Sequence, residues 1–168
     1  MRRIVTSLMI LILIFLVTGC AGETDTYLHK SKDGDWSIKM PKEFTQDKEE
    51  SDEQMKSYTV TFKTESEPVL VVNEVIDEKL EINEDILKEE FSLDNYIHVE
   101  RYDTIDIKGI GKAYGALVLD EATGMTMMYH RLKYKDKVIS FIFYWKDGFS
   151  LEQEAKAKAI ISTFKSLK

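Results

Sequence analysis

The chain has 168 residues, of which 43% are hydrophobic and 32% are charged, and its formal net charge at pH 7 is −7. This composition suffices for one hydrophobic core, and its acidic balance argues against nucleic acid as a partner. The sequence contains a single cysteine, so an internal disulfide and a cysteine-based metal site are excluded.

The first 19 residues have the three parts of a bacterial export signal. Arg2 and Arg3 precede an apolar stretch from Ile4 to Val17, and small residues follow it. This order is typical of a secretory signal peptide. The stretch is also shorter than the roughly 20 apolar residues that a permanent membrane span needs. Its end, Val17-Thr18-Gly19-Cys20, resembles the lipobox of bacterial lipoproteins.

The lipobox resemblance implies that Cys20 is the membrane anchor. A diacylglyceryl group is expected on its sulfur, followed by cleavage between Gly19 and Cys20 and a possible further acyl chain on the new amino group. Two long acyl chains hold a protein far more firmly than one myristoyl chain, which binds only marginally. The remaining interpretation is an ordinary signal peptide that leaves a free thiol.

The expected organisation is therefore a signal peptide at 1–19, a tether at 20–35 with lipidated Cys20, and one domain at 36–168. Cleavage would leave 149 residues, with 21 basic and 30 acidic side chains and a net charge of −9. The expected location is the extracytoplasmic side of the cell membrane, or the outer membrane in a Gram-negative host. Partners would be the lipid bilayer, through Cys20, and an unknown envelope protein.

The first half of the domain predicts strands separated by polar segments. Trp36 to Met40 alternates apolar and polar residues, which is typical of a half-buried strand, and Pro41 should end it. The acidic segment 47–54 predicts a solvated loop. Residues 58–63 and 69–76 predict an antiparallel pair of strands joined through residues 65–67.

A helix is predicted after Asn83, a good N-cap residue, and acidic residues in its first turn suit the helix dipole. A strand region follows from Tyr96 to Ile107. We expect four aliphatic residues of this region to point toward the core: Ile97, Val99, Ile105 and Ile107.

The last third predicts a sheet and a closing helix. A strand at 113–119 precedes a hairpin formed by 125–134 and 138–145, whose second arm has the densest apolar face and should be central. Ser150 and Gln153 form a capping-box pattern at the start of the final helix. Its apolar positions follow helical spacing, at Ala157, Ile160, Ile161, Phe164 and Leu167.

Residues 33–168 resemble the PsbP-like superfamily. The resemblance rests on Trp36-Ser37-Ile38-Lys39-Met40-Pro41 with Phe44, on Gly109-Ile110-Gly111-Lys112-Ala113, and on the segment from Ile160 to Ser166. It implies an α+β fold, with an antiparallel sheet of about six to seven strands flanked by helices that include the C-terminal one, as in a PsbP-like α/β/α sandwich. It also implies a non-enzymatic adaptor or assembly factor, and it carries over no metal or partner-binding residue.

Two ligand sites are alternatives to that interpretation. Trp36, Tyr144, Trp145 and Phe149 are candidates to line a pocket for an apolar or amphipathic ligand, although aromatic residues also fill ordinary cores. A copper site is the second alternative, since thioethers and imidazole suit copper. Strand alternation would place its candidate ligands on two faces, with Met125 and Met127 on one and Met128 and His130 on the other.

Enzymatic chemistry has little support in the sequence. His29, His98 and His130 lie in three different segments, and no local motif predicts a catalytic triad. The segment Gly109 to Gly115 is similar to a dinucleotide loop, but its third glycine is one place late and a predicted strand follows. These glycines are better explained by a turn or a close backbone contact. We expect no cofactor, no catalytic residue and no metal ligand.

The expected function is that of a membrane-anchored, extracytoplasmic, non-enzymatic binding or assembly module in the cell envelope. The alternative is a lipoprotein that binds a small apolar or amphipathic ligand in an aromatic-lined pocket.

Overall fold

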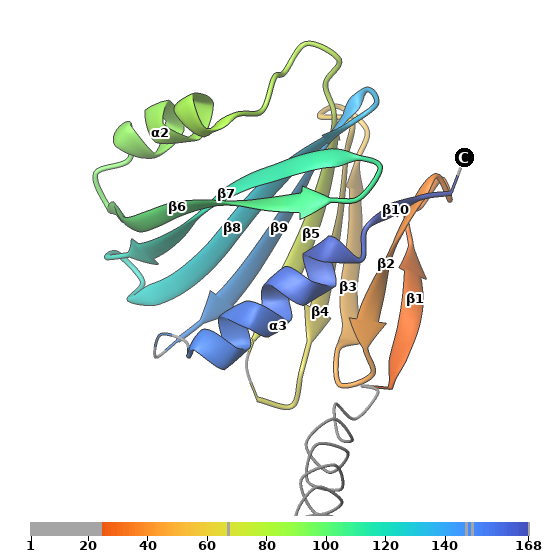
Figure 1. Ribbon diagram of the computed structural model, residues 1–168, viewed down its shortest axis with the longest axis horizontal. Coiled ribbons are helices and arrows are strands. Elements are labelled where there is room, and N and C mark those ends of the chain that lie inside the picture. The colour runs from red at the N-terminus through yellow and green to blue at the C-terminus, as the bar shows by residue number, and fades with distance from the viewer. Residues whose placement is uncertain (1–24, 67, 147, 149, 168) are drawn as a thin grey trace, which may run out of the picture.

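A computed structural model describes residues 25–66, 68–146, 148 and 150–167. The elements follow one another along the chain as shown in Figure 1. Their bounds are β1 Thr26–Lys30, β2 Trp36–Pro41, β3 Thr45–Asp52, β4 Ser57–Lys63, β5 Val69–Ile76, α2 Glu84–Ser92, β6 Ile97–Ile107, β7 Gly111–Asp120, β8 Met125–Tyr134, β9 Lys137–Trp145, α3 Leu151–Ser162 and β10 Lys165–Ser166.

Seven strands form one large antiparallel sheet in the order β3-β4-β5-β9-β8-β7-β6. The predicted β8–β9 hairpin is confirmed, and β9 is the middle strand. The turn of this hairpin includes Lys135, which has a positive φ of 56°. Strand β9 pairs with β5 on one side and with β8 on the other. The β8–β9 hairpin therefore joins the two halves of the sheet.

Helices cover both faces of this sheet, which gives an α+β arrangement (Figure 1). Asn83 caps α2 by accepting a hydrogen bond from the Ile86 backbone N–H, and Ser150 with Gln153 forms the predicted capping box of α3. A small sheet, β1-β2-β10, lies beside α3. The sequence analysis did not predict this second sheet or the C-terminal strand β10.

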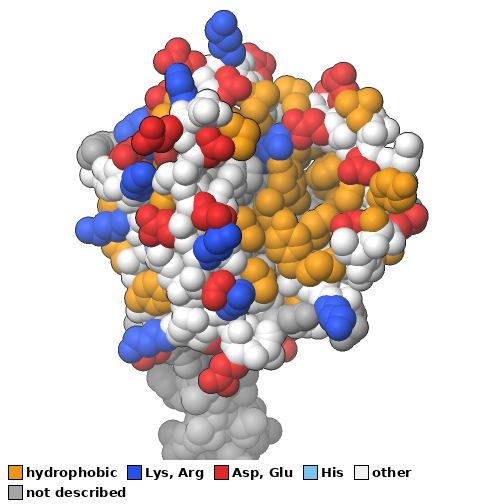
Figure 2. Space-filling model, turned by 180° about the vertical axis from the view of Figure 1, so that it is seen from behind, with side chains coloured by type: hydrophobic (Ala, Val, Ile, Leu, Met, Phe, Trp, Pro, Cys, Tyr) orange, Lys and Arg blue, Asp and Glu red, His pale blue; other side chains and the backbone are white. Residues whose placement is uncertain are grey.

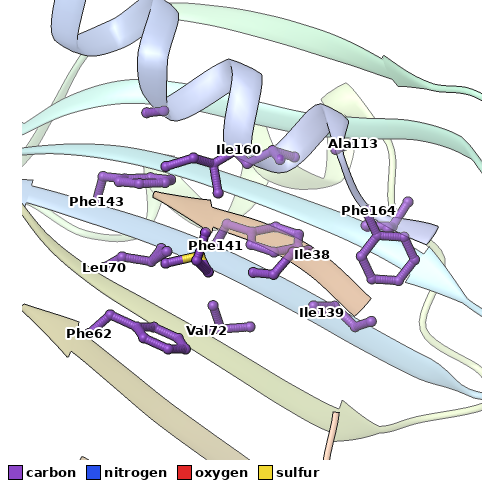
Figure 3. Packing of buried hydrophobic residues seen from close by; sticks show 14 of the residues in the cluster. Ile38, Phe62, Leu70, Val72, Ala113, Ile139, Phe141, Phe143, Ile160 and Phe164 are labelled. Carbon is purple, nitrogen blue, oxygen red and sulfur yellow. The ribbon is translucent and has the colours of Figure 1, made fainter. Parts of the chain in front are cut away.

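The core lies between the large sheet on one side and α3 with β2 on the other. Figure 3 shows Ile160 and Phe164, from α3 and its C-terminal end, facing Phe141 and Phe143 of β9. The Phe164 ring also stacks on Trp36, with the ring centroids 5.4 Å apart. Aromatic burial of this extent is a large share of the hydrophobic stabilisation of a domain of this size.

The predicted tether is wrong over much of its length, because residues 26–30 form β1 and pair with β2. The register places His29 opposite Ile38, and the His29 ring is 4.9 Å from that of Phe62. Ser31 holds the following turn by accepting hydrogen bonds from the backbone N–H groups of Asp35 and Trp36. The domain therefore begins at or before Asp25, not at Trp36.

The predicted acidic loop at 47–54 is also wrong, because most of it belongs to strand β3. This strand pairs with β4 along its length, and a bulge lies between Gln46 and Lys48. Seven of its eight side chains are exposed. The segment has no apolar period because β3 is an edge strand with no buried side, so the usual strand signal is missing.

Strand β6 contains a bulge between Val99 and Arg101 that reverses its faces. Ile105 and Ile107 point into the core as predicted. Ile97 and Val99 are paired with Asp120 and Val118, so the bulge places them on the opposite face. The prediction that all four aliphatic residues face the core is therefore wrong for these two.

Candidate functional site

The face of the large sheet that points away from the core is partly uncovered and apolar. We call it the outer face and define it by half-buried side chains on the three strands at its centre. They are Val69 and Val71 on β5, Met127 and Tyr129 on β8, and Ile142 and Tyr144 on β9. Figure 2 shows this apolar floor as an orange hollow beside a raised rim.

Strand register explains why these side chains meet. Val69 is paired with Tyr144 and Val71 with Ile142 across β5 and β9, and these partners are paired in turn with Met127 and Tyr129 of β8. Residues directly opposite in an antiparallel pair share a face, so the six side chains form two adjacent rows. The next outward pair along β5 and β4 is polar, because the Asn73 amide donates to the Thr59 hydroxyl at 2.7 Å.

Helix α2 forms the opposite wall. Its Leu87 is buried, and its Phe91 ring lies edge-on to Tyr129 with centroids 5.6 Å apart. Both Glu90 carboxylate oxygens accept from Nη1 of Arg131 at 2.6 Å. This ion pair and the ring contact fix the helix on the sheet, so the wall is preorganised rather than free to close over the floor.

Between α2 and the strands lies a groove of about 300 Å³. It is lined by Phe91, Ile97, Val118, Met127, Tyr129, Ile142 and Tyr144, with Glu90, Asp94 and Arg131 at its edges. Arg131 is neutralised by Glu90, which leaves Asp94 as the uncompensated charge among these lining residues. The Tyr144 ring extends toward Asp120, and burial together with that carboxylate raises the pKa of its hydroxyl. The groove is thus apolar at its base and acidic at its rim.

The candidate aromatic ligand site is not assembled. The side chains of Trp36 and Trp145 are 0% and 1% exposed, so they leave no surface for a ligand. Tyr144 lies on the outer face instead, opposite in direction to Trp145 on the same strand. Phe149 lies outside the described residues.

The candidate copper ligands are divided between the two faces, as predicted. Met127 lies on the outer face, whereas Met128 and His130 lie in the core. The three histidines are also apart. His29 packs in β1 against Phe62, His98 is exposed on β6, and His130 is fully buried on β8. Among the described residues no group of three His, Cys, Asp or Glu side chains is arranged to hold a metal ion.

A buried charged cluster joins the two sheets. The Lys137 ammonium lies 2.8 Å from Glu74, 3.1 Å from Asp33 and 3.3 Å from Asp35. The second Glu74 oxygen accepts from the Trp36 indole N–H at 2.6 Å. Burial alone would lower the pKa of Lys137, but hydrogen bonds to Glu74 and its other carboxylate neighbours outweigh burial and hold that pKa above its ordinary value. The ammonium is therefore charged at neutral pH.

A second charged cluster attaches α3 to β6. His130 Nε2 lies 2.5 Å from Asp103, whose other carboxylate oxygen contacts Lys158 of α3. Lys158 also pairs with Glu154 at 2.7 Å, and Glu154 contacts Arg101. Sequence reasoning missed both clusters, because their members come from distant segments and no spacing rule links them. They hold the sheet, the small sheet and α3 together, and their ionic groups do not open into the outer-face groove.

The proposed lipidation site at Cys20 and the cleavage site at Gly19 lie outside the described residues. Within residues 25–66, 68–146, 148 and 150–167, no helix is long and apolar enough to cross a membrane.

Comparison with solved structures identifies proteins with a similar fold. Cyanobacterial PsbP (CyanoP) from Synechocystis aligns over 88% of this chain and 96% of its own, with a TM-score of 0.62 and 13% identity. The Ran-binding protein Mog1p from Saccharomyces cerevisiae aligns over 87% of this chain and 97% of its own, with a TM-score of 0.50 and 10% identity. No protein-family profile matches the sequence, and no curated protein matches it significantly. The chain therefore has a PsbP-like α+β fold.

Proposed function

We propose that this chain is a lipid-anchored, extracytoplasmic binding module that docks an envelope protein on its outer face. The partner would present an apolar segment flanked by basic residues. The observation that carries the proposal is the preorganised groove beside α2, with Tyr129, Ile142 and Tyr144 at its base and Asp94 at its rim.

The physical reason is the cost of leaving such a surface in water. Each apolar Å² removed from water contributes about 25 cal/mol, so covering the half-buried apolar side chains of the outer face would favour association before entropy losses. Contiguous apolar patches of this kind commonly mark interaction sites. The net charge of −9 expected for the processed chain adds a long-range preference for a basic partner.

The anchor at Cys20 would confine this module to one membrane. A chain held by two acyl chains rarely detaches, so it meets partners in or near the same bilayer. The adaptor role implied by the sequence resemblance agrees with this arrangement, as does the lack of a catalytic motif in the sequence. No cofactor forms part of the proposal.

The test uses the full-length, tagged chain in its native membrane. A photoreactive amino acid is placed at Ile142 on the outer face and, as a matched control, at Met55, which is 68% exposed in the β3–β4 turn. Captured material is identified, purified and measured for direct binding to the wild-type chain and to Val71→Lys.

One result supports the proposal: a single protein crosslinks from position 142 but not from position 55, and the purified pair binds more than tenfold more weakly with Val71→Lys. Equal crosslinking from both positions would overturn it. So would unchanged binding of the Val71→Lys chain.

A further inference from the structure

Strand β1 is attached to the rest of the domain along one edge only. It lies at the end of the order β1-β2-β10 and pairs with β2 alone (Figure 1). Four of its five side chains are exposed or half-buried, and only that of His29 is buried. The half-buried Tyr27 adds one side-chain hydrogen bond, from its hydroxyl to the Phe44 carbonyl at 2.9 Å. The buried contact of β1 therefore rests largely on one imidazole.

The site that holds His29 suits a neutral ring. His29 is 8% exposed, and its ring centroid lies 4.9 Å from that of Phe62 and 6.0 Å from that of Trp36. Its Nε2 atom is buried and has no hydrogen-bond partner among the described residues. Protonation would place an N–H donor on both ring nitrogens and a positive charge in this site. Burying a charge without a partner is costly, so the ring fits here only while it is neutral.

Only one acidic group acts on the ring, and its effect is the smaller one. The residue opposite His29 on β2 is Ile38, which is uncharged. On β3 the Glu49 carboxylate attracts a positive His29, but it also accepts a hydrogen bond from the Tyr58 hydroxyl. Burial outweighs this attraction and lowers the pKa of His29 below its ordinary value.

The next charged groups do not supply a counterion either. Glu74 accepts from the Trp36 indole N–H on one oxygen and is neutralised by Lys137, 2.8 Å from the other. Lys32 lies over the Tyr58 ring, with its ammonium 5.9 Å from the ring centroid, and adds a positive charge to this region. A protonated His29 would therefore gain nothing from these neighbours that offsets its burial.

The cost of protonation falls on β1 rather than on the whole core. A histidine whose pKa is lowered in the folded state contributes stability above the unfolded-state pKa of about 6.5 and loses it as pH falls further. Separation of β1 from β2 returns the imidazole to water. Strand β2 has other attachments, because Trp36 stacks on Phe164 and the Ser31 hydroxyl accepts from the backbone N–H groups of Asp35 and Trp36.

We propose that β1 is an acid-released strap: protonation of His29 separates residues 26–30 from β2 and leaves the rest of the domain folded. In a membrane the release would lengthen the tether. Cys20 is five residues before Asp25 but 11 before Ser31, so the greatest extended span would rise from roughly 17 Å to roughly 38 Å. The release rests on β1 alone, whereas the lengthening also rests on the proposed anchor at Cys20.

The experiment uses the full chain, expressed in a bacterium that processes lipoproteins and reconstituted in nanodiscs of phosphatidylcholine. Hydrogen–deuterium exchange, corrected for the intrinsic rate at each pH, gives the amide protection of β1, β8 and β9. It is measured at about pH 8 and about pH 5.5, both above the ordinary carboxyl range. His29→Phe keeps an aromatic ring that cannot be protonated, and His29→Leu is a second uncharged variant. His98→Phe is the matched control, because His98 is exposed on β6.

In the wild type and in His98→Phe, the protection of residues 26–30 should fall by about threefold or more at the lower pH, while that of β8 and β9 stays constant. In His29→Phe and His29→Leu the protection of β1 should not depend on pH. A fall that persists in both His29 variants would overturn the proposal. So would an equal fall in β8 and β9, or a wild-type β1 whose protection does not change.

Energy transfer tests the lengthening separately. A donor dye is attached to a cysteine introduced at Met55, which is 68% exposed, and acceptor dyes are attached to a fraction of the lipid headgroups. A fall in transfer at the lower pH, together with the loss of β1 protection, supports a longer tether. Release of β1 without a fall in transfer would count against the anchor at Cys20 and the lengthening, but not against the release.

Discussion

Gly115 of β7 leaves the space that the imidazole of His130 fills on β8. A β-carbon at position 115 would lie 2.5 Å from the His130 ring and 2.2 Å from the Tyr129 carbonyl oxygen. Gly115 and His130 are directly paired across the two strands. The contact is therefore fixed by the backbone register, and a rotamer change alone cannot relieve it. The packing of a fully buried histidine thus depends on a residue with no side chain.

We expect Gly115→Ala to lower the free energy of unfolding by about 2–3 kcal/mol, the upper part of the range for an overpacked core. Urea denaturation of the purified chain measures this change. Gly109→Ala serves as the control. No atom lies within 4 Å of the added carbon, but the backbone φ of +78° is strained for alanine. We therefore expect a loss of about 1 kcal/mol in unfolding free energy there. Equal losses in the two variants would contradict the steric explanation.

Asp103 should make stability depend on pH. Burial alone would raise the pKa of its carboxyl group, but hydrogen bonds from His130 and Lys158 outweigh burial and hold the pKa well below its ordinary value. A carboxyl group with a depressed folded-state pKa contributes its stability above the unfolded-state pKa of about 4 and loses it as pH falls further. Asp103→Asn should cost about 1–3 kcal/mol at pH 7.

The difference in stability between wild type and Asp103→Asn should therefore shrink as the pH is lowered below about 4. Urea unfolding at a series of pH values measures it. Asp106→Asn, which removes an exposed carboxylate of the same strand, should change stability by less than about 0.5 kcal/mol. A difference between wild type and Asp103→Asn that stays constant with pH would refute this role for Asp103.

Lys137→Met should be among the more damaging single substitutions, with a loss of about 3–5 kcal/mol, because Glu74 and Asp35 would remain buried without their cation. Chemical denaturation again measures the loss. Adding Glu74→Gln to Lys137→Met should restore part of the stability, since it removes one of the uncompensated charges. If the double variant lost more unfolding free energy than the two single variants lose together, Lys137 and Glu74 would not stabilise the fold as an ion pair.

Cys20→Ser should leave the precursor unprocessed, because the lipobox chemistry needs the thiol as nucleophile. Immunoblotting of membrane fractions distinguishes the precursor from a chain shorter by the 19 residues that precede Cys20. Cys20→Ala provides a second variant without a nucleophile. A mature, membrane-bound Cys20→Ser chain would argue against lipid anchoring at this position.

The elements that sequence reasoning predicted well are those with a strong local period. Alternation over β9, with Phe141 and Phe143 on one face, correctly indicated a central strand, and the Ser150–Gln153 pattern correctly located the start of α3. In contrast, β1 and β3 were missed because one is short and the other has no buried face. The bulge in β6 was missed because one extra residue moves Val99 to the other face of the sheet, whereas the composition of the segment is that of an ordinary strand.

The candidate site was harder to predict than the fold. A half-buried row such as Val71, Ile142 and Tyr129 has the same composition as a core row, and only the placement of α2 over the neighbouring strands shows that part of it stays uncovered. Similarly, the residue type of Trp36 suits a ligand-binding site, but its indole N–H donates to Glu74 in the core. Which apolar face remains exposed depends on tertiary packing, and local periodicity does not report it.

The charged edge strand β3 has a consequence for crowding in two dimensions. Lipid anchoring would confine every copy to one membrane surface and raise the frequency of lateral collisions. Unpaired backbone groups on an apolar edge would then be a template for copy-to-copy strand pairing. On β3 the Lys48–Glu50 pair and the neighbouring Glu49 force any such approach to desolvate several charges. A strand that adds nothing to the core thus gives the molecule a non-adhesive flank, which would let anchored copies accumulate in a membrane without polymerising.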